Sequence, residues 1–284
     1  MKYRILSLLL AMLFMSFAAA AEEGNGSGVA SASDMTDVID IVDENSVPVT
    51  AQQLNDGVYP VAVDVSSSMF KVVGCEVTVQ DGKMTARLSM KSKSYEAMYP
   101  GTAEDAARAP KEALAMLEEQ ADGKLTFTLP IDAFDAGYEC AALSARKQLW
   151  YPRTLVFRSD SLPLDAWKEE CLKTPESLAL SDGTYTCDVR LEGGGRASLA
   201  SPAVVTVQDG KCSARIVFST SKIDYMIVDC QRFEPAGNEN GAAFTVPVAV
   251  FDRKLPITVD STAITPSVEV AYSMTFDAQS IAPQ

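Results

Sequence analysis

Val77-Thr78-Val79-Gln80-Asp81-Gly82-Lys83 returns later in the chain as Val205-Thr206-Val207-Gln208-Asp209-Gly210-Lys211. Two further pairs of matching stretches lie around it, in the same order and at approximately the same spacing. They are residues 54–59 with 180–185, and residues 127–130 plus 134–135 with 244–247 plus 251–252. Three ordered matches are not expected by chance, so the sequence indicates a tandem duplication of one domain.

Apolar residues alternate with other residues around the repeated stretches. The alternating residues are Tyr59, Val61, Val63, Val65, Met84, Ala86, Leu88 and Met90 in the first copy, and Tyr185, Cys187, Val189, Leu191, Cys212, Ala214, Ile216 and Phe218 in the second. A period of two with one apolar face is typical of antiparallel strands packed on a core. Asp81-Gly82 and Asp209-Gly210 lie between two such runs and indicate hairpins, because glycine accepts the positive φ of a tight turn.

These patterns predict an all-β protein with two tandem immunoglobulin-like β-sandwich domains. The predicted domains are residues 51–160 and 179–278, each of roughly 100–110 residues, which is the size of an immunoglobulin fold. Residues 161–178 are the predicted linker between them, and residues 279–284 form a short tail.

The first copy carries an insertion with helical character. Thr102 and Asp105 resemble a helix N-cap box, and a run rich in Ala, Leu and Glu follows them. We therefore predict a helix near residues 102–120, interrupted or kinked near Pro110. The second copy has a shorter and more polar stretch at the equivalent place, residues 231–241.

The N-terminus has the features of an export signal. Lys2 and Arg4 precede an apolar run that ends in a small-residue cleavage site, so residues 1–21 are a predicted signal peptide, too short for a stable membrane span. Residues 22–50 hold seven acidic residues and no Lys or Arg, which predicts a disordered acidic spacer. The mature chain is expected to have no membrane span and to be extracellular, either secreted or held non-covalently at the cell surface.

The chain is strongly acidic and has no histidine. Its formal net charge of −14 argues against nucleic-acid binding, because phosphate contacts need clustered Lys and Arg. A sequence without histidine excludes Ser-His-Asp and Cys-His catalysis, and His-ligated zinc or haem. No nucleophile elbow, carboxylate-pair motif or Gly-rich phosphate loop stands out, so the sequence does not predict an enzyme. Any metal ligand has to be Tyr, Met, Cys or a carboxylate.

Six cysteines in an exported protein predict disulfide bonds. Cys75 and Cys140 are the only cysteines of the first copy, and both are missing from the second copy, as expected for a bonded pair. The remaining cysteines, which allow three pairings, are Cys171, Cys187, Cys212 and Cys230. Strand parity points Cys187 and Cys212 toward the core, which favours that pair together with Cys171–Cys230. Metal binding by these four is the alternative, although no close C-x-x-C pair supports it.

The order of the motifs resembles the NEAT (near iron transporter) domain. The matching parts of the first copy are residues 54–59, Ser68-Met69-Phe70, and residues 77–83 and 151–157. The resemblance implies immunoglobulin-like sandwiches at a bacterial surface, and many such domains bind haem in a slot under a short lip helix. It therefore implies haem capture in bacterial iron acquisition, with haem or a haemoprotein as the partner.

The chemistry of haem gives this hypothesis a site in the first copy. Haem needs an apolar slot, an axial ligand and cations for its propionates, and a phenolate oxygen or a methionine sulfur can ligate the iron. Met69 and Phe70 are predicted to cover the ring from the lip, with Ser68 reaching one propionate. The other predicted site residues are the cations Lys71, Lys91 and Lys93 and, on the closing hairpin opposite the lip, Trp150 and Tyr151.

Two residues are candidates for the iron ligand. In the family, the ligand is the first tyrosine of a Tyr-x-x-x-Tyr motif on the closing hairpin, where this chain has a single tyrosine. Tyr151 is therefore the first candidate and Met69 the second. A Tyr-x-x-x-Tyr string does occur at Tyr95 and Tyr99, after the fourth predicted strand. These two tyrosines either pack in a surface turn or line the mouth of a pocket together with the nearby lysines.

Alternatives stay open for both copies. The lip stretch of the second copy, residues 191–197, has no Met or aromatic residue, and its closing strand has Tyr272 alone, so it is predicted to be structural or to bind a different partner. The alternative for the first copy is an immunoglobulin-like adhesion module that binds an envelope protein or a glycan, because sandwich folds host many functions. Only a haem binder would develop a Soret band on titration with hemin.

Overall fold

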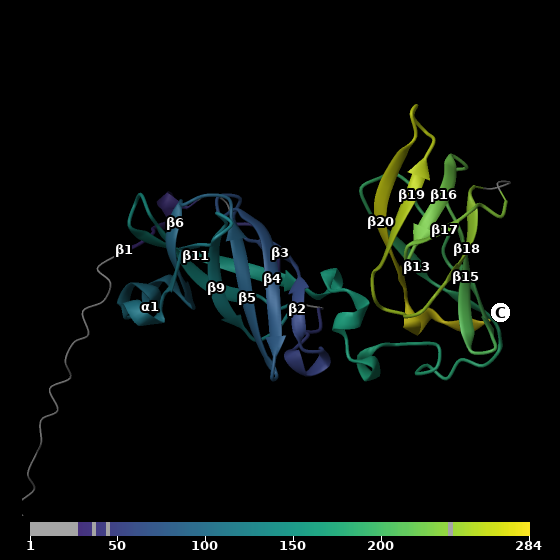
Figure 1. The fold of residues 1–284 in the computed structure, drawn as a ribbon, viewed down its shortest axis with the longest axis horizontal. Helices are drawn as coiled ribbons and strands as arrows, with labels where there is room; N and C mark the ends of the chain where they lie inside the picture. The colour runs from purple at the N-terminus through teal and green to yellow at the C-terminus, as the bar shows by residue number, and fades with distance from the viewer. Residues whose placement is uncertain (1–27, 36–37, 44–45, 238–240) are drawn as a thin grey trace, which may run out of the picture.

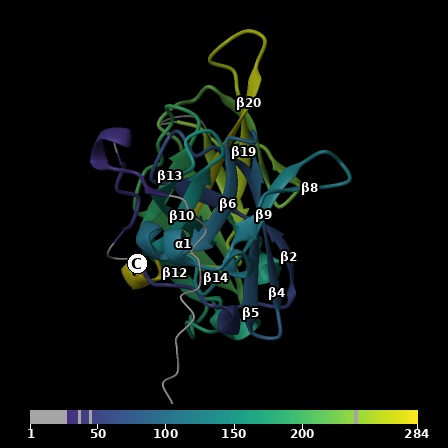
Figure 2. The ribbon, with the colours of Figure 1, turned by 90° about the vertical axis from the view of Figure 1, so that its left-hand side faces the viewer.

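Strands in four sheets make up almost all of the regular structure, which confirms the predicted all-β class (Figures 1 and 2). The computed structural model describes residues 28–35, 38–43, 46–237 and 241–284. Two sheets are built from residues 28–158, here called the N-terminal half, and two from residues 183–284, the C-terminal half. The predicted signal peptide, residues 1–21, lies outside the described residues.

The N-terminal half has two sheets, whose strand pairs are antiparallel except for the parallel pair β1–β11. The first sheet has the order β2 (Gly57–Pro60), β4 (Val72–Gln80), β5 (Lys83–Met90), β9 (Leu125–Ile131), β8 (Glu118–Glu119). The second has the order β1 (Gly28–Val29), β11 (Leu149–Arg158), β10 (Tyr138–Ser144), β6 (Tyr95–Pro100), β7 (Ala115–Met116), and β3 (Ala62–Val65) also pairs with β11.

The C-terminal half also has two sheets. One has the order β18 (Ala243–Pro247), β15 (Lys211–Val217), β14 (Ala203–Gln208), β12 (Gly183–Cys187), β21 (Ala282–Pro283). The other has the order β13 (Val189–Gly193), β20 (Val268–Phe276), β19 (Leu255–Ser261), β16 (Ile223–Val228), β17 (Gln231–Phe233). The short 3₁₀ turns are η1 (Ala32–Asp34), η2 (Ala51–Gln53), η3 (Lys111–Ala113), η4 (Ser159–Ser161), η5 (Leu164–Ala166), η6 (Glu169–Cys171) and η7 (Ala278–Ser280).

The strand orders of the two halves correspond. The row β2-β4-β5-β9 matches β12-β14-β15-β18, and the row β3-β11-β10-β6 matches β13-β20-β19-β16. Both predicted Asp-Gly hairpins are present, with φ of 51° and 73° at Asp81 and Gly82 and of 52° and 72° at Asp209 and Gly210. Each pair of positive φ angles is what a two-residue hairpin turn requires.

Apolar side chains from both sheets of a half meet in one core. The N-terminal core includes Val77, Ala86 and Phe127 from one sheet and Leu155 and Phe157 from the other; the C-terminal core includes Val205, Ala214, Phe244, Met274 and Phe276. The predicted alternation is confirmed along β5, where Met84, Ala86, Leu88 and Met90 are buried. Burial of these apolar side chains, at roughly 25 cal/mol per Å² of apolar surface, is the main favourable contribution to the free energy of folding of the sandwich.

The helix predicted near residues 102–120 is much shorter than expected. Helix α1 runs only over Ala103–Arg108, and the Thr102 hydroxyl accepts a hydrogen bond of 3.1 Å from the Asp105 amide, as a capping residue does. The next residue, Ala109, is extended, because a residue before proline is pushed out of the helical region. After Pro110 the chain makes a 3₁₀ turn and then the short strands β7 and β8.

The N-terminal segment lies on the sheet, where a disordered spacer was predicted for residues 22–50. Strand β1 pairs with β11, and Ala30 and Val49 are buried. Further along, the Ile39 amide donates a hydrogen bond of 2.9 Å to the carbonyl of Ser66. Strand pairing outweighs the acidic composition in these residues because the unpaired edge groups of β11 accept a partner. Among the described residues, no helix is both long and apolar enough to cross a membrane.

All six cysteines are free thiols, so none of the three predicted disulfides is present. Cys187 and Cys212 point into the core as predicted, but their strands β12 and β15 lie on opposite sides of β14. Two strand spacings separate their Cα atoms by about 9.6 Å or more, which is beyond the reach of about 7 Å for a disulfide. Cys75 and Cys140 lie on the two facing sheets and are both buried free thiols. Cys230 is exposed and Cys171 half-buried.

We expect six thiols per chain of the denatured protein to react with Ellman's reagent without prior reduction. In the native protein at pH 8, Cys230 should react quickly while Cys75 and Cys140 stay protected. Burial raises the pKa of both to about 12, so hardly any thiolate forms. Fewer than six thiols in the denatured, unreduced chain would restore the disulfide prediction.

Candidate functional site

Two adjoining cavities of about 400 Å³ and 320 Å³ lie in the N-terminal half and share Met69, Ser94 and Tyr95 in their walls. Here they are called the basic cleft. The first is also lined by Asp34, Lys93, Ser144, Ala145, Arg146, Lys147, Tyr151 and Arg153, and the second by Lys71, Met90, Lys91 and Ser92. Both volumes lie in the range of about 300–1,000 Å³ that is usual for ligand sites.

The cleft concentrates positive charge in an acidic protein. Its lining cations are Lys71, Lys91, Lys93, Arg146, Lys147 and Arg153, and its lining carboxylate is Asp34. Lys93 is paired with Glu119 at 2.7 Å and Lys147 with Asp34 at 3.1 Å. The hydrogen bond to Asp34 raises the pKa of Lys147, and hydrogen bonds from Ser31 and then from Lys147 lower the pKa of Asp34. A cluster of one sign in a concave site focuses its field and attracts anions.

Tyr151 and Arg153 reach the cleft from the same face of β11. Side chains alternate along a strand, so these two lie in the row of Leu155 and Phe157, which faces the core. Arg153 is only 5% exposed, and its guanidinium carbon lies 5.1 Å from the centroid of the Tyr151 ring. An arginine therefore occupies a core-facing position at the edge of the cavity.

The predicted lip is a turn without a helix. Buried Ser66 holds its start, because the Thr154 amide donates to the Ser66 hydroxyl at 2.9 Å and the Ser66 amide donates to the Thr154 carbonyl at 3.0 Å. Beyond it, Met69 is 59% exposed and lines both cavities. Ser68 is exposed and lies outside the lining. Phe70 was expected to cover a ligand but is buried in the core, in edge-to-face contact with Tyr95 at 5.1 Å between centroids.

A β-bulge separates Tyr95 from Tyr99. On β10, Leu143 pairs with Ala97 and the next residue, Ser144, pairs with Tyr95, so β6 has one extra residue at Glu96. An inserted residue reverses the side of the sheet on which the following side chains lie. Tyr95 therefore faces the cleft and the main core, while Tyr99 packs with the small cluster beside α1. The prediction that both line one pocket mouth is wrong for Tyr99.

Trp150 also lies on the other face of its sheet. It is fully buried among Ala97, Ala103, Ala106 and Leu143, beneath α1; Figure 1 shows α1 beside β6 at that end of the half. The prediction that Trp150 forms a wall of the crevice is wrong, because Trp150 and Tyr151 are strand neighbours and must point to opposite faces. The predicted site residues that do line the cleft are Met69, Lys71, Lys91, Lys93, Tyr95 and Tyr151.

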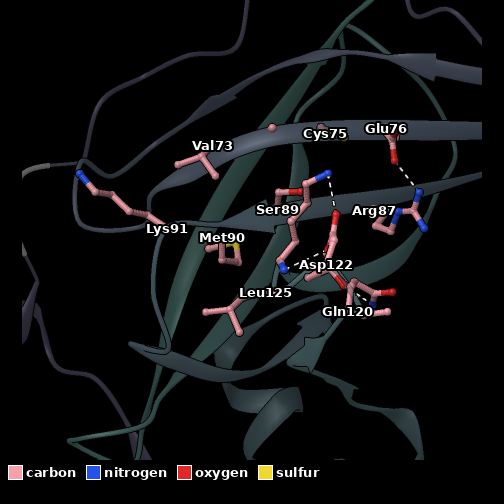
Figure 3. Close-up of a pocket in the computed structure, with 15 residues that line it drawn as sticks. Val73, Cys75, Glu76, Arg87, Ser89, Met90, Lys91, Gln120, Asp122 and Leu125 are labelled. Carbon is pink, nitrogen blue, oxygen red and sulfur yellow. Dashed lines mark hydrogen bonds and ion pairs between the residues drawn. The ribbon is translucent and has the colours of Figure 1, made fainter.

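A larger cavity of about 660 Å³ lies beside β4, β5 and the loop before β9 (Figure 3). Four of its five charged lining residues pair with one another, Arg87 with Glu76 and Lys124 with Asp122, and the fifth is Lys91. Of the predicted site residues, only Lys91 lines it, at the end away from the Glu76–Arg87 pair. This cavity therefore lacks the cation cluster of the basic cleft and the candidate iron ligands.

The C-terminal half has different residues at the place equivalent to the cleft. The Asp135 amide donates to the carbonyl of Phe157 and the Asp252 amide to that of Phe276, both at 2.8 Å, which aligns β11 with β20. By this alignment, Tyr272 and Val270 stand where the N-terminal half has Arg153 and Tyr151.

A glycine loop closes over Tyr272. A Cβ added at Gly195 would lie only 1.6 Å from the Tyr272 hydroxyl, and one at Gly193 would lie 2.8 Å from the carbonyl oxygen of Ala271. Gly193 also has a φ of 137°, which favours glycine. The backbone of this loop therefore packs directly against Tyr272.

No protein-family model matches the chain, and no curated protein matches it in sequence. Among solved structures, a mutant of IsdX2-NEAT5, determined in complex with heme, is similar to part of the chain. The identity is 17% and the TM-score 0.30, and the match covers 35% of this chain and 98% of that one. The likeness therefore concerns about a third of the chain.

Proposed function

We propose that the basic cleft binds haem or a related porphyrin without catalysing a reaction. The observation that carries the proposal is that Met69 and Tyr151, the two candidate iron ligands, line the same cavity as a cluster of cations. Methionine sulfur and tyrosine oxygen are both known haem ligands. When bound, haem would supply an iron centre for one of these atoms and two propionates for the cations.

The metal-ligating side chains available elsewhere in the chain agree with this proposal. There is no histidine, and the described residues contain no group of three or more His, Cys, Asp or Glu side chains that could hold a metal ion. A porphyrin needs only one axial ligand from the protein, because its own nitrogens provide the equatorial set. The aromatic and thioether side chains of Tyr95, Tyr151 and Met69 supply apolar surface for a flat ring.

We also propose the setting in which this binding takes place. The two halves would be tandem NEAT-like copies of one domain, of which the N-terminal copy captures haem and the C-terminal copy has a structural role. The chain would be exported by its signal peptide and act in bacterial iron acquisition, with haem or a haemoprotein as its partner. The correspondence of strand order and the closed glycine loop of the C-terminal half support this division.

A titration of the mature chain with hemin tests the proposal. A shifted Soret band that saturates at one equivalent is expected. Met69→Ala should weaken binding, because Met69 lines both cavities, while the matched variant Met116→Ala removes a similarly exposed methionine outside the cleft. Absence of a Soret shift in the wild-type chain would overturn haem binding and leave the adhesion module as the surviving hypothesis.

A further inference from the structure

Arg153 is a buried cation without a counter-charge from the described part of the protein. Two of the five N–H donors of its guanidinium are used, by the Pro152 carbonyl at 2.8 Å and the Tyr95 hydroxyl at 3.0 Å. Its Nε has no hydrogen-bond partner among the residues that the structure describes. None of the carboxylates in the described residues forms an ion pair with it.

The rings of Tyr95 and Tyr151, with centroids 5.8 Å and 5.1 Å from the guanidinium carbon, offset only part of the cost of a charge at this position. A buried charge costs several kcal/mol unless it is paired and hydrogen-bonded. In the C-terminal half, the equivalent position of β20 holds the neutral Tyr272, which is buried in the core. The same strand arrangement therefore forms without the arginine, and what distinguishes the Arg153 position is that it borders the cleft.

We propose that the guanidinium of Arg153 binds a carboxylate of the ligand that enters the cleft. The inference rests on the proposed function and narrows it, because the ligand must be a flat aromatic molecule with at least one carboxylate. Tyr95 fixes the guanidinium through its hydroxyl, and Phe70 in turn packs edge-to-face on Tyr95. A planar fork held in this way matches the two oxygens of a carboxylate better than the flexible rim lysines do.

Asp34 supplies a competing carboxylate inside the same cleft. It comes from the N-terminal segment, pairs with Lys147 at 3.1 Å and accepts a hydrogen bond of 2.7 Å from the Ser31 hydroxyl. Together these partners hold the pKa of Asp34 below its usual value, so it stays charged at neutral pH. A ligand carboxylate must therefore bind next to an anion that already neutralises one of the cations. Removal of the Asp34 charge should tighten ligand binding.

Equilibrium titrations with two matched pairs of probes test the proposal on the mature chain. The probes are hemin against hemin dimethyl ester, and pyrenebutyrate against pyrenebutanol, so that each pair differs in the carboxylate. Arg153→Met is expected to weaken hemin and pyrenebutyrate about 10- to 100-fold, the range for a hydrogen bond to a charged group. The two probes without a free carboxylate should change less than about twofold by the same reasoning.

Three further variants complete the test. Arg153→Lys keeps the charge and loses the fork, so it should give an intermediate loss. Asp34→Asn should tighten hemin and pyrenebutyrate about two- to fivefold, as expected for one solvated charge. Arg158→Met removes an arginine of the same strand that is paired with Asp64 and lies outside the cleft, so it should leave all four affinities unchanged.

Each outcome decides between the two proposals. If Arg153→Met binds hemin and pyrenebutyrate as tightly as the wild-type chain, the proposed role of Arg153 is wrong. If Arg153→Met does not fold, the same result for Arg153→Lys leads to the same conclusion. If the wild-type chain does not bind hemin but binds pyrenebutyrate, and Arg153→Met weakens that binding, the haem proposal is wrong and the carboxylate site is supported. Failure of the wild-type chain to bind either carboxylate probe overturns both.

Discussion

Tyr151→Phe is expected to abolish the Soret shift of the hemin complex while the protein stays folded. Tyr151 and Tyr95 both line the cleft, but the Tyr95 hydroxyl is engaged by Arg153 at 3.0 Å. The Tyr151 hydroxyl is hydrogen-bonded to Lys147 instead, whose side chain is exposed and can turn away more easily than the buried Arg153. Tyr151 is therefore the better placed oxygen donor. Loss of a direct ligand should lower hemin affinity by at least the roughly 10- to 100-fold that is typical when an outer-shell partner of a metal site is removed. Absorbance titration of the two proteins measures the difference.

The matched control is Tyr99→Phe, which removes one hydroxyl from a neighbouring tyrosine that faces the cluster beside α1. It should bind hemin like the wild-type chain. If Tyr151→Phe keeps the band and Met69→Ala loses it, the ligand is the methionine sulfur, the second candidate from the sequence. If both single variants keep the band, neither residue ligates the iron.

Local patterns in the sequence were enough to predict the class and much of the strand layout. Alternation identified the buried rows of β5 and β15, and the Asp-Gly pairs identified both hairpins. These features depend on near neighbours in the chain, so one sequence contains the whole signal. The extent of α1 could also have been predicted, since Pro110 had been recognised as a break.

One part of the site, the orientation of residues 150–153, could have been predicted from the sequence but was missed. Period two along residues 150–153 places Tyr151 and Arg153 on one face and Trp150 on the other. The prediction instead placed Trp150 and Tyr151 on the same wall of the haem site and assigned no role to Arg153. Applying to the closing strand the parity rule that worked for β5 would have corrected both.

Other features depend on distant contacts that a single sequence does not contain. The bulge at Glu96 that separates Tyr95 from Tyr99 appears only in the pairing of β6 with β10. The pairing of β1 with β11, which brings Asp34 to the cleft, joins segments more than a hundred residues apart. Long-range pairing of this kind outweighs local composition, which had predicted a disordered spacer.

Trp167→Ala is expected to be among the most destabilising single substitutions in the connecting segment, by about 3–5 kcal/mol for a buried tryptophan. The sequence placed this residue in a linker, residues 161–178. In the structure it is 2% exposed and belongs to the core of the N-terminal half, and its carbonyl accepts a hydrogen bond of 3.0 Å from the Asn55 side chain. Urea unfolding followed by far-UV circular dichroism should show the transition of the N-terminal half at lower denaturant.

A substitution of Arg253 is the control, because it separates the stability contributed by burial of the Trp167 indole from that contributed by its contact with the C-terminal half. Its guanidinium carbon lies 3.7 Å from the centroid of the Trp167 ring, and burial lowers its pKa. Arg253→Met removes the cation and leaves the indole covered, so the expected loss is only about 0.5–2 kcal/mol, the range of a cation–π contact. A loss below about 1 kcal/mol for Trp167→Ala would be too small for a core residue and would mean that residues 161–178 behave as the linker that the sequence predicted. A large loss for Trp167→Ala with a small one for Arg253→Met would show that the connecting segment belongs energetically to the N-terminal core.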